Sequence, residues 1–491
     1  MKVSRYKKYE SPILWGCFVL FLILTFISTW THEPWFDEIH AWQLSKLSLY
    51  EIYYQMRYEG HFMLWYLILY PFSHLGFSFQ TLGIVSWTIN AIGISYLFWK
   101  APFAWWAKIS LLFTFPFSYV NPCISRPYVL IPLLTFMLAY YYTKTLMPKE
   151  WTIKGDGYLA CGVLLALLAN THVYSEGFVG IVSLMLLWHT TKNWHILDVH
   201  QKRTRIISFA IIFVGVLVAF LQVYPSFEHS SILKDIGSTS GTIWQFFTVS
   251  MDLAKFGTIG KAVYSLSSIG LLFVCLFFLV KERKGAAAIL FFSCLYMVLF
   301  NLYIYGAGAE GRAIMWFYFL LFSLWIICDC PNYAEENRLT KNKLWSSMAI
   351  LLFSILLFQP QRAFSDYKDF YSGESRFSFF IKEHVDNHHI IHRIPTGYCH
   401  VLEEYLPNHS FEDIEDIDSF KKGNPKFSRE VAADNTKNDS IYVMGCINRW
   451  NETLNYDLFQ NYNYTILYPT KDEERNYYLQ YYLIMISRVN E

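Results

Sequence analysis

Long apolar runs recur along the first three-quarters of this chain, and they restrict its fold more than any other feature. Each run approaches the length that a helix needs to cross the hydrocarbon core of a bilayer. Of the 491 residues, 54% are hydrophobic and only 16% are charged, which excludes an ordinary soluble protein. The sequence therefore predicts an α-helical polytopic membrane protein with about eleven transmembrane helices. Their expected positions are 12–30, 79–99, 106–121, 127–146, 157–171, 176–190, 206–225, 262–280, 285–304, 313–328 and 344–359.

The short run 62–75 decides the orientation of the chain. It contains Pro71, and we treat it as a helix on the outer face, because counting it as a crossing would invert every later loop. The inner segments then hold 19 Lys and Arg, and the outer segments, which are longer in total, hold 7. This positive-inside bias predicts a multi-pass protein of the inner (cytoplasmic) membrane with a cytoplasmic N-terminus. The inner segments are 1–10, 99–108, 141–157, 190–206, 281–285 and 329–343.

The composition changes beyond Pro360, where the chain becomes polar and contains no further spanning run. Short β-rich stretches alternate with helical patterns there, which predicts a small extracytoplasmic α/β domain. The sequence thus divides into a transmembrane domain, 1–360, whose first outer loop is 31–78, and a soluble domain, 361–491. The strands are expected at 389–394, 440–446, 464–468 and 481–486, and the helices at 376–385 and 400–406.

Two features of the soluble domain leave alternatives open. Cys399 and Cys446 both lie in it, and an oxidising compartment would permit a disulfide, whereas two buried free thiols are the other interpretation. The high Lys, Asn, Tyr and Phe content favours a bacterial inner membrane, while four glycosylation sequons keep the endoplasmic reticulum open. The sequons are at Asn408, Asn438, Asn451 and Asn463.

A polar cluster in the first outer loop is the strongest functional signal. Asp37, Glu38 and His40 follow the first apolar run, and Glu59 and His61 precede the next one. Two adjacent carboxylates with two histidines at a membrane surface suit a base-catalysed reaction on a substrate arriving from the bilayer. We predict Asp37 as the general base and Glu38 as its partner, with His40, Glu59 and His61 binding substrate. The alternative for Asp37 is a helix cap.

A second set of polar residues falls in later loops that the topology puts on the same outer face. Its members are Arg126, His172, Tyr174, Glu176, Glu310 and Arg312. Charges near span ends are costly and often mark a site, so we predict that this set binds substrate. Arg126 and Arg312 could hold a phosphate or only anchor to lipid headgroups. His172 and Glu176 could share a divalent metal, but hydrogen bonding between loops is favoured, and no residue is predicted as a metal ligand.

At these residues the chain resembles the GT-C membrane glycosyltransferases, in particular the protein O-mannosyltransferase and aminoarabinose-transferase branch. That branch has an Asp-Glu pair in its first outer loop, then a surface helix, then a His-Pro-Pro-Leu or Lys-Pro-Pro-Leu element opening a hydrophobic helix. The pair here is Asp37-Glu38, and the histidine of the second element is His61. Phe62 and Met63 replace the two prolines.

The resemblance implies transfer of a sugar from a polyprenyl-phosphate donor to an acceptor hydroxyl on the outer face of the membrane, in cell-envelope glycan biosynthesis. The acceptor would be a glycan, a lipid or a protein. Such a donor is already activated, so no cofactor is required, although a divalent metal stays compatible. No phosphate-binding glycine loop or nucleotide fingerprint is present, and no nucleic-acid partner is expected. Arg126 and Arg312 would stabilise the leaving phosphate, and the 42 Phe and 36 Tyr could line a groove for the prenyl tail.

Two other functions remain in competition. A flippase or transporter of lipid-linked glycans would also have many spans, but it should carry charged or broken helices near the bilayer midplane. A polysaccharide polymerase or ligase would share the outer-face chemistry. It usually depends on Arg and His in a large late loop, and the 225–261 loop is poor in both.

Overall fold

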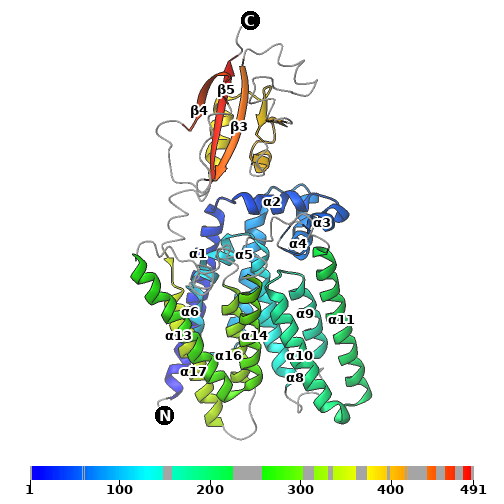
Figure 1. Cartoon of the computed structure of the whole chain (residues 1–491). Coiled ribbons are helices and arrows are strands. Elements are labelled where there is room, and N and C mark those ends of the chain that lie inside the picture. The colour runs from blue at the N-terminus through cyan, green and yellow to red at the C-terminus, as the bar shows by residue number, and fades with distance from the viewer. Residues whose placement is uncertain are drawn as a thin grey trace. The chain divides into compact units, whose positions relative to one another are not determined.

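The computed structural model shows two compact units (Figure 1). It describes residues 3–57, 59, 61–146, 157–224, 257–301, 314–329, 336–360, 373–394, 399–414, 417, 440–448, 459, 461–469 and 479–487. The helical unit comprises Met1–Trp30 and Leu44–Phe364, and the second unit comprises Thr31–Gln43 and Ser365–Glu491. The sequence division at 360 leaves 31–43 with the transmembrane domain, whereas the contacts of this segment join it to the second unit.

The helical unit contains helix in every predicted span, over the residues that the structure describes. Its elements are α1 (Val3–Thr31), α3 (Leu49–Gln55), α4 (Leu64–His74), α5 (Thr81–Lys100), α6 (Trp105–Leu112), η1 (Pro116–Val120), α7 (Asn121–Cys123), η2 (Pro127–Val129), α8 (Leu130–Thr145), α9 (Tyr158–Ala169), α10 (Ser175–Asn193), η4 (Trp194–Ile196), α11 (Val199–Val223), α13 (Gly257–Glu282), α14 (Lys284–Phe300), α16 (Met315–Asp329) and α17 (Glu336–Leu356). Within the described residues, α1, α5 and α11 are long and apolar enough to cross a membrane, and α9, α14 and α16 are shorter apolar helices.

Burial along these helices follows the pattern of a bundle surrounded by lipid. Every residue of α16 from Met315 to Cys328 is buried, which places this helix in the centre of the unit. In contrast, α1 and α11 expose large apolar side chains such as Ile23 (52%) and Phe213 (66%). An exposed apolar surface of this kind is stable against hydrocarbon and unfavourable against water.

The predicted span 106–121 is wrong as a single helix. It breaks into α6, the π-helical turn η1 and the short α7, because proline lacks the N–H that an α-helix needs and clashes with the preceding turn. Pro116 and Pro122 occupy the first turns of the last two pieces. Between the pieces, Phe115 donates its N–H to the carbonyl oxygen of Leu357 at 2.7 Å, which replaces the lost helical bond.

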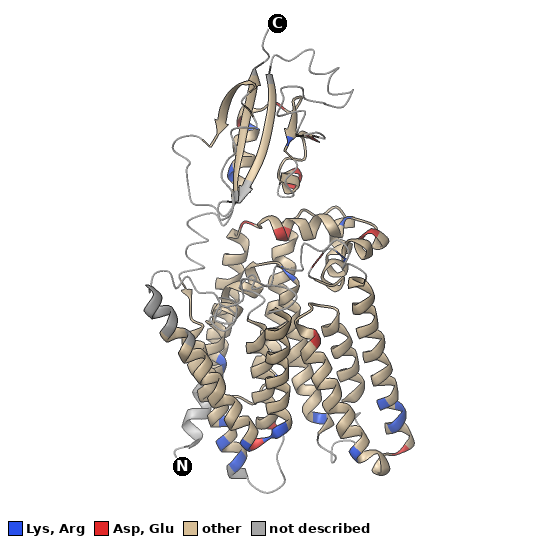
Figure 2. Ribbon diagram, viewed as in Figure 1, with Lys and Arg blue, Asp and Glu red and all other residues tan. Residues whose placement is uncertain are grey.

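The run 62–75 forms only a short helix. At about 1.5 Å per residue, the 11 residues of α4 extend roughly half the thickness of a hydrocarbon core. Figure 2 shows that Lys and Arg of the helical unit gather at the end where α11, α14 and α17 begin. This is the distribution that the positive-inside rule describes, and the direction of the N-terminus stays a prediction.

The second unit is built on a five-stranded mixed sheet, which confirms the predicted small C-terminal α/β domain. The strands are β1 (Ile390–Arg393), β2 (Ser410–Asp413), β3 (Ser440–Asn448), β4 (Asn463–Tyr468) and β5 (Leu479–Ser487), in the order β2-β1-β3-β5-β4. β1 pairs in parallel with β2 and β3, and β5 pairs antiparallel with β3 and β4. The helices are α19 (Glu374–His384), η9 (Cys399–Val401), α20 (Leu402–Tyr405) and the first part of α2 (Phe36–Ser45).

Both faces of this sheet carry a buried apolar cluster, and the alternation along the strands explains why. Successive strand residues point to opposite faces, so Met444 and Leu483 pack in the cluster that includes Phe377 of α19, while Val443 and Ile484 pack in the other. Cys399 and Cys446 are buried free thiols in the α19 cluster. The free-thiol interpretation of these two residues is therefore the one that the structure describes.

Candidate active site

A buried cationic cluster lies in the helical unit at Arg126. Its Nη2 atom is 2.6 Å from Nε2 of His61, and the two residues are only 7% and 2% exposed. Because a guanidinium can only donate, Nε2 of His61 must be the acceptor, which puts the proton of the neutral imidazole on Nδ1. Tyr128 contacts both partners, with its ring 5.5 Å from the His61 ring and 6.0 Å from Cζ of Arg126.

The local sequence around Arg126 explains its conformation. Pro127 follows it, and a residue before proline is restricted to extended backbone angles; Arg126 has φ −124° and ψ 161°. Pro127 then opens η2, which continues into α8, so the guanidinium belongs to the residue just before a helix N-terminus. That end of a helix carries a partial positive charge and favours anions.

The loop between α9 and α10 completes the cluster. His172 forms an isolated antiparallel bridge with His61, and the two rings are 4.9 Å apart. Nδ1 of His172 accepts the N–H of Tyr174 at 3.0 Å, and the Tyr174 hydroxyl donates to Oδ1 of Asn301 at 2.9 Å. The structure therefore brings together four predicted site residues, His61, Arg126, His172 and Tyr174.

Glu59 and Glu176 are partly buried residues of the same unit. Glu176 lies in the first turn of α10, where a carboxylate interacts favourably with the helix dipole. Tyr296 of α14 lies against this turn and donates its hydroxyl to the carbonyl oxygen of Val173 at 3.1 Å. Glu310 and Arg312, which the sequence also proposes, lie outside the described residues.

An apolar groove of about 590 Å³ lies in the same unit, between the start of α4, α9 and α11. Its walls are aliphatic except at one end, where Asn170 and Gln222 lie. Gln222 accepts the N–H of Met63 at 2.7 Å and donates to Asn170 at 2.8 Å. Met63 and Asn170 are each two residues from a histidine of the cluster, so the polar end of the groove and the cluster share the same two chain segments.

The helices α9 and α11, which line this groove, pack closely against each other. A Cβ atom added at Gly215 of α11 would lie 2.5 Å from Cβ of Ala166 on α9, and one at Gly162 would lie 2.9 Å from the carbonyl oxygen of Ser208. Real Cβ atoms do not approach so closely, so both glycines are needed for the two helices to meet at this distance.

The second unit contains the Asp-Glu pair, and the two carboxylates have different environments there. Glu38 is fully buried; its Oε2 accepts the N–H of Trp35 at 3.1 Å and pairs with Nε2 of His32 at 3.0 Å. Glu38 is the third residue of α2, and a glutamate at that position commonly satisfies the N-cap amide. The capping role that the sequence left open for Asp37 is therefore filled by Glu38.

Asp37 and His40 lie on the same helix with partial exposure. Asp37 is in the first turn of α2 and half-buried. His40 is one turn further on, and its ring stacks on Phe36 with the centroids 5.7 Å apart. Of the two adjacent carboxylates, Asp37 is the one that the fold leaves partly open to solvent.

A group of further carboxylates lies around the start of α2, and no sequence pattern predicts it. Glu33 accepts the N–H of Ser375 at 2.5 Å, and Tyr405 donates its hydroxyl to the carbonyl oxygen of Pro34 at 3.1 Å. Glu374 is fully buried and accepts the Tyr481 hydroxyl at 3.1 Å. Burial raises the pKa of Glu374 to about 7, and the negative charge of Glu38 adds to the rise.

This chain is similar to known proteins in its structure and not in its sequence. No family model matches this sequence, and no curated protein matches it by sequence. The chain has the helical bundle and the small C-terminal sheet domain of the predicted fold class, and solved structures with the same fold confirm this class.

Solved structures of ArnT from Cupriavidus metallidurans resemble this chain. The crystal structure of ArnT bound to undecaprenyl phosphate aligns with a TM-score of 0.58 at 11% identity, over 95% of this chain and 97% of that one. The apo structure aligns with a TM-score of 0.57 at 12% identity, over 96% and 98%. At such low identity the likeness establishes the fold.

Proposed function

We propose that this protein is a membrane glycosyltransferase that takes its sugar from a polyprenyl-phosphate donor. The observation that carries the proposal is the arrangement of Arg126, His61 and His172 beside the polar end of an apolar groove. A polyprenyl phosphate has the complementary form, with a long hydrocarbon chain ending in an anion. The ArnT fold supports the same ligand class, since one of the ArnT structures contains undecaprenyl phosphate.

In this proposal Arg126 binds the phosphate and stabilises it as it leaves. The bond between the sugar's anomeric carbon and the phosphate oxygen breaks, and the phosphate keeps the electron pair. Its negative charge therefore grows in the transition state, where a preorganised guanidinium is most effective. The hydrogen bond to His61 holds Arg126 in one orientation before the donor arrives.

Asp37 is proposed as the general base. As the acceptor oxygen bonds to the anomeric carbon, its proton passes to the Asp37 carboxylate. Glu38 holds the first turn of α2 through its bonds to Trp35 and His32, and thereby fixes the direction of Asp37. Glu38 is thus a positioning residue. The substrate-binding roles proposed for Glu310 and Arg312 rest on the sequence.

The proposed location is the inner membrane, with the N-terminus in the cytoplasm and the C-terminal unit outside. The gathering of Lys and Arg at one end of the helical unit supports this orientation (Figure 2). The acceptor is a glycan, lipid or protein hydroxyl. A polymerase or ligase would use the same outer-face chemistry, and a flippase would move the donor without breaking the bond to the sugar.

The test measures transfer and binding in parallel with the purified full chain. Membranes supply polyprenyl-phosphate sugars, and the product is identified by mass spectrometry; binding uses undecaprenyl phosphate itself. Asp37→Asn keeps the shape but removes the basic oxygen, so turnover should fall by about 100-fold or more while lipid binding persists. Asp198→Asn is the matched control, because Asn caps a helix as well as Asp and Asp198 caps α11.

Arg126→Ala should weaken both lipid binding and turnover, the latter on the order of 100-fold. Arg338→Ala is the control, since Arg338 is 40% exposed and pairs with Glu282 at the basic end of the unit.

Near-normal transfer by Asp37→Asn would exclude Asp37 as the general base. Lipid translocation without release of the sugar would instead establish a flippase.

A further inference from the structure

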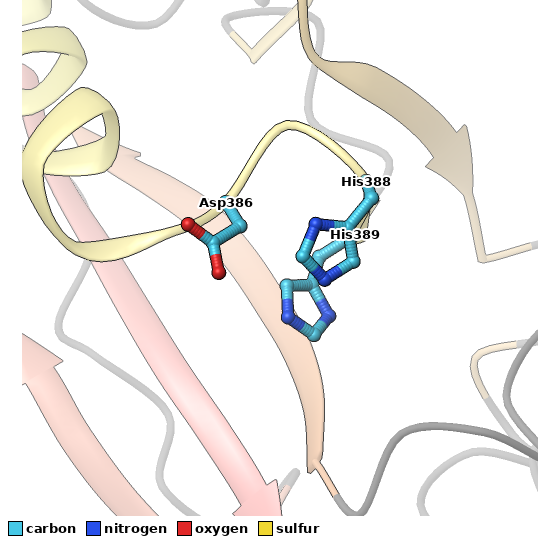
Figure 3. A group of neighbouring side chains, drawn as sticks. All are labelled: Asp386, His388 and His389. Atoms are coloured by element: carbon cyan, nitrogen blue, oxygen red, sulfur yellow. The ribbon is translucent and has the colours of Figure 1, made fainter.

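Three potential metal ligands meet in the turn that joins α19 to β1. They are Asp386, His388 and His389, and one ligand atom from each lies within 4.8 Å of the others. Figure 3 shows the two imidazole rings close together, with Asp386 on the same turn beside them. The sequence alone does not predict this site, because adjacent residues of an extended strand point to opposite sides.

The backbone of the turn explains how adjacent histidines come to share one side. Consecutive residues of an extended strand point in opposite directions. Here His389 donates its N–H to the carbonyl oxygen of Asp386 at 3.0 Å, which closes a turn before β1 begins at Ile390. The two rings consequently lie 4.4 Å apart, and the His389 ring meets Tyr442 of β3 edge-on at 5.1 Å.

We propose that this turn binds one divalent transition-metal ion of the Zn²⁺ type. Two imidazoles and one carboxylate suit Zn²⁺, Co²⁺, Ni²⁺ or Cu²⁺, whereas Mg²⁺ and Ca²⁺ prefer oxygen ligands throughout. Tetrahedral Zn²⁺ holds its ligand atoms roughly 3.3 Å apart. Asp386 and His388 are exposed, so rotation of their side chains can close the remaining distance.

The site differs from the proposed catalytic residues in position. Glu374 and Ser375 begin α19, where Ser375 bonds to Glu33, and the metal turn follows the other end of this helix. An 11-residue helix extends about 16 Å. Three protein ligands leave a fourth position for water, and the bound ion would link the end of α19 to the start of β1. The ion would therefore stabilise the turn between α19 and β1, and the proposal gives it no role in sugar transfer.

The experiment titrates the purified full chain with Zn²⁺ by calorimetry, after removal of any affinity tag. One equivalent should bind, and excess Mg²⁺ or Ca²⁺ should not compete. Asp386→Asn, His388→Asn and His389→Asn should each weaken Zn²⁺ binding at least 10-fold. His400→Asn is the control, since His400 is 46% exposed in the same unit but outside the turn.

Co²⁺ provides a second readout, because its visible absorption reports tetrahedral nitrogen and oxygen coordination. The spectrum should appear with the wild-type chain and with His400→Asn, and it should be absent in the three turn variants. The melting temperature of each variant, measured without added metal, serves as the check that it is folded. Zn²⁺ binding of equal strength in wild type and turn variants, or no saturable binding at all, would overturn the proposal.

Discussion

Glu374→Gln should change the pH dependence of stability in the second unit. Glu374 is fully buried at the start of α19, and burial, with the charge of Glu38, raises its pKa to about 7 from the ordinary 4.5. A raised pKa means that the folded state prefers the protonated acid. The stabilisation is complete below pH 4.5 and is lost as the pH rises through 7.

The size of the effect follows from the shift. Each pKa unit corresponds to about 1.4 kcal/mol, so ionising Glu374 in the folded state should cost about 3 kcal/mol above pH 8, relative to pH 4. Glutamine stays neutral, and its side-chain oxygen can still accept the Tyr481 hydroxyl. The variant should therefore lack this loss, and the difference between the two proteins should grow from pH 5 to pH 8.

Hydrogen exchange of the full chain measures this locally. The opening free energy of amides in β5 and α19 is followed from pH 5 to pH 8, for wild type, Glu374→Gln and the exposed control Glu383→Gln. His392 has the opposite sign, because burial lowers its pKa to about 4 and its contribution is lost as the pH falls below 6.5. Subtracting the variant from wild type removes that contribution. Identical pH profiles for wild type and Glu374→Gln would refute the reasoning.

The remaining predictions address the groove, the helix cap and the topology. Val218→Trp should obstruct the apolar groove and weaken undecaprenyl phosphate binding about 10-fold or more. Leu217→Trp is the control, because Leu217 is on the same helix but outside the groove lining. Equal binding by both variants would exclude the groove as the lipid site. Glu38→Gln should lower both the melting temperature and the turnover, because the variant loses the contact between the Glu38 carboxylate and His32. A loss of turnover without a change in melting temperature would instead give Glu38 a direct role in catalysis. Reporter fusions after Lys108 should report the cytoplasm and fusions after Phe370 the outside, and a fusion after Lys108 that reports the outside would reverse the map.

Local patterns in the sequence determined most of the elements. Residues 440–446 form an almost continuous apolar, β-rich run, so the sequence predicts β3 close to its observed bounds, 440–448. In contrast, β2 was not predicted, because Ser410–Asp413 is a polar edge strand whose stability comes from pairing with β1. The break after α6 was also missed, since hydropathy records apolar character and not the effect of proline on a helix.

The candidate site shows the same limit. The adjacent carboxylates at 37 and 38 suggest a shared chemical role in the sequence. In the structure, the Glu38 carboxylate accepts the N–H of Trp35 and so caps the N-terminus of α2. The bond between Glu33 and Ser375 joins residues 342 positions apart, and nothing local predicts it. His61 and Arg126 were each proposed from the sequence, while their direct contact is a property of the tertiary fold.

The membership of residues 31–43 in the second unit has a consequence for biosynthesis. This segment is made early, but the residues that contact it, such as Ser375 and Tyr405, emerge only after every helix of the bundle. At a synthesis rate of about 5–20 residues per second, Ser375 is made about 20 to 70 s after its hydrogen-bond partner Glu33. A chain ending at Pro360 should therefore leave α2 open to protease, which limited proteolysis can measure. The loop that carries Asp37 can reach its final packing only once translation is nearly complete, so an unfinished chain in the membrane would lack an assembled first loop.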